Sequence, residues 1–267
     1  MKPPESGAGG RPVGRISRRA SKALREPFSN QWRDLLSTRL DWWSNLSEAE
    51  QRHMEDLIRI FLAEKTMEGV IGYTPDEEVR LLIAAQACLL ILGLDYRFYD
   101  DVSAIVVSPG LVVQRGSRRL DGGVVSDDHP ALAGQAMLHG PVLLVWDRVA
   151  NDARHPERGH NVVFHEFAHK IDMRNGAADG VPPLSSSLAE RWGEHMPAML
   201  AKLRAGSPMP FDAYAATNPA EFLAVVTEAF FVLPRELAGA EPDLYSLLRD
   251  FYQQDPYARA RDALSDV

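Results

Sequence analysis

Two histidines and a glutamate have the spacing of a metal site. His165, Glu166 and His169 belong to the sequence His-Glu-Phe-Ala-His. On a helix, side chains four residues apart lie one turn apart on the same face, so the two imidazoles can bind one metal ion. Imidazoles at this spacing suit zinc, and the glutamate suits a general base that acts on a zinc-activated water. This is the chemistry of a zinc peptidase.

The residues around this pattern are apolar on most sides of the expected helix. Val162, Val163 and Phe164 precede the first histidine, and Phe167 and Ile171 flank the second. A helix that is apolar nearly all round is a buried helix, and a buried polar group without a partner costs kilocalories. A metal ion would give the histidines a partner. The alternative is a pair of core histidines held by ordinary hydrogen bonds.

A zinc site needs a third protein ligand and an open position for water, and two downstream glutamates are candidates. Glu221 follows Asn218-Pro219, which has the pattern of a helix N-cap and a first helical residue. Asn218 and Glu221 also fit a capping box in which Asn replaces Ser or Thr, which gives Glu221 a purely structural interpretation. Glu228 lies two turns further along the same face and is the rival ligand. Spacing alone does not separate these alternatives.

Two more polar residues could assist such a site. Tyr214 precedes Glu221 by seven residues, and its phenol could donate a hydrogen bond to a developing oxyanion; the alternative is a half-buried tyrosine that packs the loop. Asp172 lies three residues after His169 on the same face and could accept a hydrogen bond from a ligand imidazole. Its alternative is a solvated carboxylate near the helix end.

The chain resembles the Mlc titration factor A family of zinc-dependent peptidases from about Trp32 to Pro256. The stretches that carry the resemblance are residues 161–172, 174–176, 180–182, 212–231 and 251–256, with 83–88 and 140–146 upstream. The core of the stretch 212–231 reads Tyr-Ala-Ala-Thr-Asn-Pro-Ala-Glu. The same arrangement of His-Glu-Phe-x-His and of Tyr, six residues, then Glu-Phe is similar to the catalytic domain of anthrax lethal factor, a more distant relative.

The resemblance implies a role for each candidate. One Zn²⁺ is held by His165, His169 and Glu221, with Glu166 as the catalytic base and Tyr214 as the transition-state stabiliser. The preference for this third ligand over the rival glutamate comes from the resemblance. Some members of the family bind the glucose-responsive repressor Mlc and relieve repression of sugar uptake. A transcriptional repressor is therefore a second expected partner, beside a peptide or protein substrate.

Composition bounds the class of protein. The chain has 267 residues, 45% hydrophobic and 25% charged, which suits a globular protein with a substantial core. Its single cysteine, Cys88, excludes disulfides within the chain and is expected to be a core residue, because no charged activator lies beside it in sequence. Residues 1–25 hold seven Lys or Arg and one Glu, a net charge of +6; the whole chain carries −8, so the remainder carries −14.

The charge asymmetry predicts a disordered basic tail over residues 1–27, followed by a single domain over residues 28–267. The tail lacks the apolar core of a signal peptide, and no apolar run is long enough to span a bilayer. We therefore expect a cytoplasmic protein without a membrane span. The acidic body argues against direct nucleic-acid binding.

Local patterns predict helices and then strands ahead of the expected helix that carries His165 and His169, called the metal helix below. Ser47 and Glu50 form a capping box, and Thr74-Pro75 predicts a second helix start, with Gly93 as its stop. Strands are expected at residues 104–107, 111–114 and 142–146. The loop 115–134 contains Asp127, Asp128 and His129, which are expected to lie on the surface rather than to bind a second metal. An edge strand of this sheet could align an extended peptide.

The part of the chain after the metal helix is predicted to be mostly helical. An amphipathic helix is expected over residues 188–203 with a break near Pro197, followed by the helix of Glu221, which ends before Pro234, and by a helix over residues 244–252. The histidines at positions 155 and 160 are expected to be solvated loop residues.

Together these features predict an α+β fold of the zincin-like metallopeptidase type, with a small sheet before the metal helix and a mostly helical remainder. The expected function is zinc-dependent hydrolysis of peptide bonds, and both aminopeptidase and endopeptidase action fit it. The alternative is a regulatory protein, weakly catalytic or not catalytic, that sequesters an Mlc-like repressor. A purely structural zinc protein is disfavoured, because structural sites are usually closed by four ligands rich in cysteine.

Overall fold

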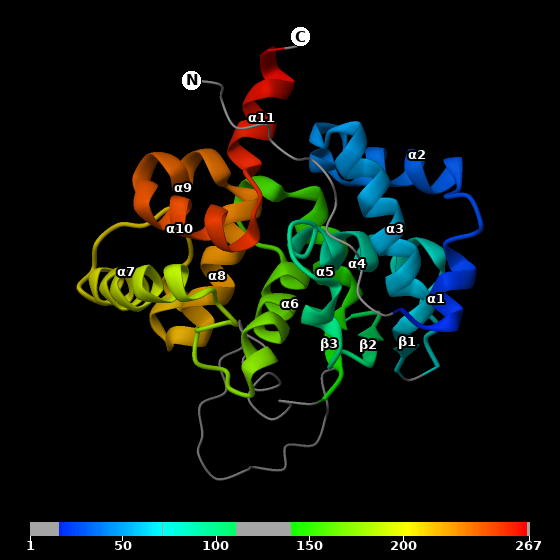
Figure 1. Ribbon diagram of the computed structural model, residues 1–267, viewed down its shortest axis with the longest axis horizontal. Coiled ribbons are helices and arrows are strands. Elements are labelled where there is room, and N and C mark those ends of the chain that lie inside the picture. Colours follow the sequence, from blue (N-terminus) through cyan, green and yellow to red (C-terminus); the bar gives the residue numbers. More distant parts are fainter. Residues whose placement is uncertain (1–15, 71, 111–139, 266–267) are drawn as a thin grey trace.

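The computed structural model describes residues 16–70, 72–110 and 140–265. Within these ranges the chain is mostly helical with one small sheet, which confirms the predicted α+β class (Figure 1). The elements up to the metal helix are α1 (Arg18–Ala23), α2 (Asn30–Arg39), the 3-10 helix η1 (Asp41–Asn45), α3 (Glu48–Glu64), β1 (Thr66–Gly69), α4 (Glu77–Leu90), η2 (Tyr96–Tyr99), β2 (Ala104–Ser108), β3 (Val142–Val145), α5 (Trp146–Arg154), η3 (Pro156–Arg158) and α6 (Val162–Asp172).

The elements that follow are helical throughout the described residues. They are η4 (Met173–Asn175), α7 (Ser186–Arg204), η5 (Ala213–Ala216), α8 (Pro219–Val232), α9 (Pro234–Ala240), α10 (Pro242–Tyr252) and α11 (Pro256–Ser265). None of the described helices is long and apolar enough to cross a membrane. The predicted strand 111–114 and the cluster Asp127, Asp128 and His129 lie outside the described residues.

The predicted disordered tail is wrong for its last part. Residues 18–23 form α1, which Ser17 caps by accepting a hydrogen bond from the backbone N–H of Ala20. Ala20 is fully buried in the core, and α1 packs on α3. The backbone N–H of Ser17 also donates to Glu64, at the end of α3, at 2.9 Å. Buried Ala20, the contact of Ser17 with Glu64 and a hydrogen bond from Arg59 of α3 to the carbonyl of Leu24 therefore attach a segment whose composition resembles a disordered tail. Residues 1–15 lie outside the described range.

The sheet is parallel, with the strand order β1-β2-β3. Thr66 of β1 is opposite Ala104 of β2, and Ile105 is opposite Val142 of β3. Parallel pairing requires crossovers, and α4 lies between the first two strands in sequence. β1 was not predicted, because Thr-Met-Glu-Gly lacks a β-branched pattern. The third predicted strand ends at Val145, one residue early, since Trp146 begins α5.

Two helices, α3 before the sheet and α4 between β1 and β2, begin directly after their capping residues. The capping box of Ser47 and Glu50 is present, as predicted. The predicted start at Thr74-Pro75 is wrong, because Asp76 caps α4 by accepting from the N–H of Val79, and the helix runs from Glu77 to Leu90, short of the predicted stop. Cys88 is fully buried in this helix, which confirms it as a core residue.

Of the C-terminal helices, α8 packs against α6, and α7, α9 and α10 pack against α8 (Figure 1). α8 ends at Val232, before Pro234 as predicted. The predicted break of α7 is wrong, because Pro197 lies inside an uninterrupted helix. Pro197 has no N–H to donate to the carbonyl of Gly193, four residues earlier in the helix. Both residues are exposed, so water can satisfy that carbonyl.

Aromatic contacts fix α6 between the two halves of the chain. Phe167 lies 5.1 Å from Tyr99 and 5.8 Å from Phe61, measured between ring centroids. One helical turn earlier, Phe164 lies 5.4 Å from Phe231 of α8. Aromatic pairs at these separations add stabilisation beyond burial of their area. α6 is therefore held on two sides, and the polar residues between these aromatics have a fixed direction.

Gly180 joins the three helices around the metal pattern. Its N–H donates to Asp172 of α6 at 2.8 Å, and its carbonyl accepts from the indole N–H of Trp192 of α7 at 2.9 Å. Its φ is +77°, and a Cβ at this position would lie 2.4 Å from the carbonyl oxygen of Pro219, the first residue of α8. Only glycine permits both this backbone conformation and this approach.

Replacing Gly180 by Ala should therefore lower the free energy of unfolding by about 2–5 kcal/mol, from the left-handed conformation and the displaced contact together. Gly176→Ala is the matched control, because Gly176 also has a positive φ, of +95°, but a Cβ there would meet no atom within 4 Å. The control should lose only about 1–2 kcal/mol. Chemical denaturation of both variants measures the difference, and equal losses would contradict the contact with α8.

Candidate metal centre

The first half of the site is built on α6. Asn161 caps the helix by accepting a hydrogen bond from the N–H of Phe164 at 3.0 Å. His165 and His169 follow one turn apart, as their spacing predicts, and their ring centroids are 4.9 Å apart. Their Nε2 atoms face one another at 3.2 Å. Both imidazoles therefore present the same nitrogen to one point in space.

The second half of the site comes from the first turn of α8. The N–H of Glu221 donates to the Asn218 side chain, which is the predicted capping contact. The Glu221 carboxylate is a different group from the capped N–H, and it faces the histidines. Its Oε2 atom lies 3.1 Å from Nε2 of His165 and 3.6 Å from Nε2 of His169. Only one half of the predicted capping box is therefore present among the described contacts: Asn218 caps α8, but the Glu221 side chain faces the imidazoles instead of bonding back to the cap.

The three facing atoms fit a zinc ion. In a tetrahedral site with zinc–ligand distances of about 2.0–2.1 Å, two ligand atoms lie about 3.3 Å apart, and the three separations here are 3.1, 3.2 and 3.6 Å. Oε2 of Glu221 is buried and makes no hydrogen bond within the described structure. Among the described residues, these three side chains form the group of His, Cys, Asp or Glu whose ligand atoms lie close enough together to hold one metal ion. Two imidazoles and a carboxylate are zinc-type donors.

Glu228, the rival ligand, lies on the other side of His165. Its Oε1 atom is 2.7 Å from Nδ1 of His165, and its Oε2 accepts from the backbone N–H of Asn161 at 2.6 Å. Glu228 is therefore placed to fix the tautomer and direction of one imidazole, which is what carboxylates next to metal ligands do. Sequence reasoning put Glu228 on the correct face of the helix but did not identify this contact.

The hydrogen bond predicted from Asp172 to a ligand imidazole is wrong. Asp172 is fully buried, its Oδ2 accepts from the N–H of Gly180, and its Oδ1 makes no hydrogen bond within the described structure. Burial raises its pKa to about 6, although the Gly180 N–H acts in the opposite direction. Asp172 thus ties the end of α6 to the loop before α7, while Glu228 takes the position beside the imidazole.

The charges of the cluster support one another. Burial disfavours a charged His165, but the adjacent carboxylates of Glu221 and Glu228 outweigh it and raise its pKa to about 10. Burial likewise disfavours an ionised Glu221, but the two imidazoles outweigh it and lower its pKa to about 2. Glu221 is therefore a carboxylate at neutral pH, the form that binds metal.

Glu166 and Tyr214 lie beside this cluster. Burial raises the pKa of Glu166, although the neighbouring imidazoles act in the opposite direction. The N–H of Tyr214 donates to Asp212, the cap of η5, and the Tyr214 ring centroid lies 6.4 Å from that of His165. Burial and the adjacent Glu221 raise the pKa of Tyr214 to about 12. The phenol therefore keeps its proton at neutral pH, which is the form that can donate a hydrogen bond.

A series of hydrogen-bonded side chains that was not predicted continues away from the cluster. The side-chain N–H of Asn161 donates to Oε1 of Gln86 at 2.7 Å, and the Gln86 amide in turn donates to the carbonyl of Leu82. Gln86 is 1% exposed. The one available signal was an amide inside an otherwise apolar helix, since a buried amide requires partners.

The two loop histidines differ in their surroundings. His155 pairs with Glu157 at 3.2 Å, in the exposed turn η3. His160 lies 3.8 Å from Asp212 and 4.0 Å from Glu228, atom to atom. His160 is therefore closer to the cluster than its prediction as a solvated loop residue implies, although it remains 43% exposed.

Comparison with known proteins assigns the chain to a family. The model of the glucose-regulated metallo-peptidase M90 family matches residues 15–253. An uncharacterized protein from Synechocystis sp. is 36% identical over 89% of each chain. The Mlc titration factor A proteins of Serratia proteamaculans and Escherichia coli are 33% and 31% identical, over 86% and 87% of this chain and 88% and 89% of their own lengths. As its sequence predicts, the chain belongs to this M90 metallo-peptidase family, together with the Mlc titration factor A proteins.

Proposed function

We propose that the protein is a zinc-dependent peptidase with a single zincin-like domain. The observation that carries this proposal is the convergence of two imidazole nitrogens and one carboxylate oxygen, from His165, His169 and Glu221, at separations that suit one zinc ion. The matching family is described as a metallo-peptidase family, which supports hydrolysis of peptide bonds as the reaction class. α1 packs on this domain, so we extend its predicted start from residue 28 to residue 18.

The residues around the zinc ligands divide the reaction among them. A zinc ion bound there would act as a Lewis acid toward water and the scissile carbonyl. Glu166 accepts a proton from the attacking water and delivers it to the leaving nitrogen, and its raised pKa brings it closer to the range that suits this task. Tyr214 donates a hydrogen bond to the carbonyl oxygen as negative charge develops there. Glu228 holds the imidazole of His165.

The substrate side of the proposal rests on the sheet. Among the strands of the described residues, β3 is at the edge of the order β1-β2-β3, and it packs against α6, which carries His165 and His169. An extended peptide can pair with such an edge through backbone hydrogen bonds. Lys170 of α6 donates to the carbonyl of Gly140, two residues before β3, at 2.9 Å. This contact supports a fixed position of the edge strand relative to the catalytic residues.

A second candidate function is the capture of a transcriptional repressor. It is favoured by the relatives named Mlc titration factor A, which resemble this chain over more than four fifths of its length. This function requires a cytoplasmic location and does not require turnover. Catalysis and capture can therefore be separated by a variant that keeps the site but loses the base.

Glu166→Gln should retain zinc and lose about 10²–10⁴-fold in kcat, because it removes the general base but no metal ligand. Turnover of chromogenic peptide anilides and of a protein substrate measures the loss, and elemental analysis measures the zinc. Glu157→Gln is a matched control, since the one ion pair of Glu157 within the described ranges is with His155, at the exposed turn η3. Full turnover by Glu166→Gln would exclude Glu166 from the mechanism.

The same variant tests the regulatory function. If the protein acts by capture, Glu166→Gln should bind an Mlc-type repressor with unchanged affinity in a pull-down or calorimetric titration, because the exchange of one carboxylate for an amide leaves the surface shape intact. If the repressor is instead a substrate bound through the catalytic cleft, the wild type should cleave it and the variant should not.

Glu221→Ala should lower zinc affinity by more than about a hundredfold, since the loss of a direct ligand exceeds the effect of a residue behind the ligand. Glu236→Ala is the comparison variant, because Glu236 is in the first turn of α9 and contributes nothing to the cluster. Zinc titration against a chromophoric chelator measures both affinities. Wild-type zinc affinity in Glu221→Ala would overturn the assignment of the third ligand.

A further inference from the structure

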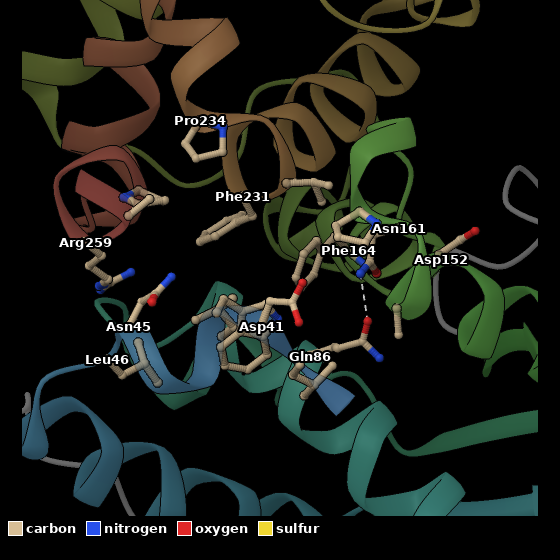
Figure 2. Close-up of a pocket in the computed structure, with 18 residues that line it drawn as sticks. Asp41, Asn45, Leu46, Gln86, Asp152, Asn161, Phe164, Phe231, Pro234 and Arg259 are labelled. Atoms are coloured by element: carbon tan, nitrogen blue, oxygen red, sulfur yellow. Dashed lines mark hydrogen bonds between the residues drawn. The ribbon is translucent and has the colours of Figure 1, made fainter. Parts of the chain in front are cut away.

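A cavity of about 260 Å³ lies beside the amino-terminal turn of α6 (Figure 2). Its walls come from η1, α4, the ends of α5 and α8, the starts of α6 and α9, and α11. Phe164 lines it, whereas the next residue, His165, faces Glu221. The lining includes none of the zinc ligands and neither of the proposed catalytic residues. The cavity is therefore a second site, separate from the candidate metal centre.

The body of the cavity is apolar and partly aromatic. Trp42, Phe164 and Phe231 contribute rings, and Leu46 and Leu89 contribute aliphatic walls. An apolar cavity of about 150 Å³ can hold a benzene molecule, so this larger cavity has room for an aromatic ring with a short side chain. Aromatic faces attract organic cations as well as apolar groups.

The charged groups of the cavity differ in whether they are already paired. The oxygens of Asp152 accept from the N–H of Val162 and from the Asn151 side chain. Arg259 forms hydrogen bonds with Glu50 and Gln254, so its charge is compensated by a residue outside the cavity.

Asp41 is different. Its side chain and that of Asn45 make no hydrogen bond or ion pair with the described part of the chain, although both line the cavity. Figure 2 shows the Asp41 carboxylate among the lining side chains, and Asp41 is exposed to solvent. The cavity thus offers, next to an apolar, aromatic space, an exposed carboxylate and the half-buried amide of Asn45, neither of them paired within the described part of the chain.

Three hydrogen bonds connect the cavity wall to the metal centre. Gln86 and Asn161 both line the cavity, and the Asn161 amide donates to Gln86 at 2.7 Å, drawn as the dashed line in Figure 2. The backbone N–H of Asn161 donates to Glu228 at 2.6 Å, and Glu228 binds Nδ1 of His165 at 2.7 Å. Each group in this chain is buried or nearly so, which keeps its hydrogen bonds from being exchanged for water.

We propose that this cavity is a second binding site, for a primary ammonium group on a small apolar or aromatic body, and that its occupancy strengthens zinc binding through Gln86, Asn161 and Glu228. The ammonium group binds Asp41 and the Asn45 carbonyl oxygen, and the apolar body lies against Phe164 and the leucines. A ligand that contacts the Gln86–Asn161 pair favours the arrangement in which Glu228 holds the imidazole. The proposal of amine binding does not depend on the proposed function. The proposal that amine binding strengthens zinc binding rests on it, through the role of His165 as a zinc ligand.

Two sources supply this chemistry: a free amine, and the N-terminal residue of a peptide, which every hydrolysed peptide bond creates. 2-Phenylethylamine represents the first, and the peptide Phe-Gly-Gly represents the second. Calorimetric titration of chelator-treated, zinc-free protein with each probe separates binding here from binding at a metal. Binding of both identifies the peptide N-terminus as an accepted form, and binding of the amine alone restricts the site to free amines.

The neutral probe 2-phenylethanol has the same size and ring, so it measures the role of the charge. We expect the wild type to bind the amine at least about tenfold more tightly than the alcohol, and Asp41→Asn to remove this preference. Asp34→Asn, the same change on the exposed face of α2, should leave it intact. No detectable amine binding, or equal amine affinity in Asp41→Asn and the wild type, would overturn the site.

The coupling is measured as the zinc affinity of the wild type with and without saturating 2-phenylethylamine. We expect an increase of about fivefold or more, and by reciprocity the same increase in amine affinity when zinc is bound. Gln86→Leu should show no such increase when it is measured at an amine concentration that saturates this variant itself, because the change removes the hydrogen bond with Asn161. An unchanged or weakened zinc affinity in the wild type would overturn the coupling, whatever the behaviour of the variant. A protein that binds no zinc at all would refute the proposed function while the amine titration still decides the cavity.

Discussion

The contact between α6 and α8 places two imidazoles and two carboxylates inside an otherwise apolar interface. Buried ionisable groups are costly unless each is paired and hydrogen-bonded, and here each supplies what another needs. Glu228 binds the outer nitrogen of His165, and Glu221 faces its inner nitrogen. Any rotation of either helix would separate these pairs and expose uncompensated charge. The polar cluster therefore fixes the register of the two helices as firmly as their aromatic contacts do.

The scaffold around this interface supports the same register from outside. Gly180 connects the end of α6, the middle of α7 and the first residue of α8 through one N–H, one carbonyl and one close backbone contact. Phe164 packs against Phe231 of α8, and Phe167 packs against Tyr99 of η2, so α6 is held against elements from both halves of the chain. The site is thus carried by helices rather than loops, with Tyr214 held on a capped 3-10 turn. Groups on such elements are positioned more precisely than groups on loops.

The sequence carried the parts of this arrangement that are local. The four-residue spacing of His165 and His169 determines their common face, and the cap at Asn218 determines where α8 begins. It did not carry the parts that depend on how two helices meet. Glu221 and Glu228 share a face seven residues apart, so only the packing of α8 on α6 decides which one meets each imidazole nitrogen. Asp172 is a further example: it lies on the predicted face of α6, but its Oδ2 accepts a hydrogen bond from the N–H of Gly180 instead of from an imidazole.

The two glutamates that bracket His165 also explain why the cluster attracts a cation. With Nδ1–H donating to Glu228, the lone pair of Nε2 faces Oε2 of Glu221 at 3.1 Å and Nε2 of His169 at 3.2 Å. Three electron-rich atoms this close repel one another unless positive charge lies between them. A proton can supply that charge, which is why the pKa of His165 rises to about 10. A bound zinc ion would supply more of it to all three atoms at once, so metal and proton would compete for one position, and metal binding would release the proton.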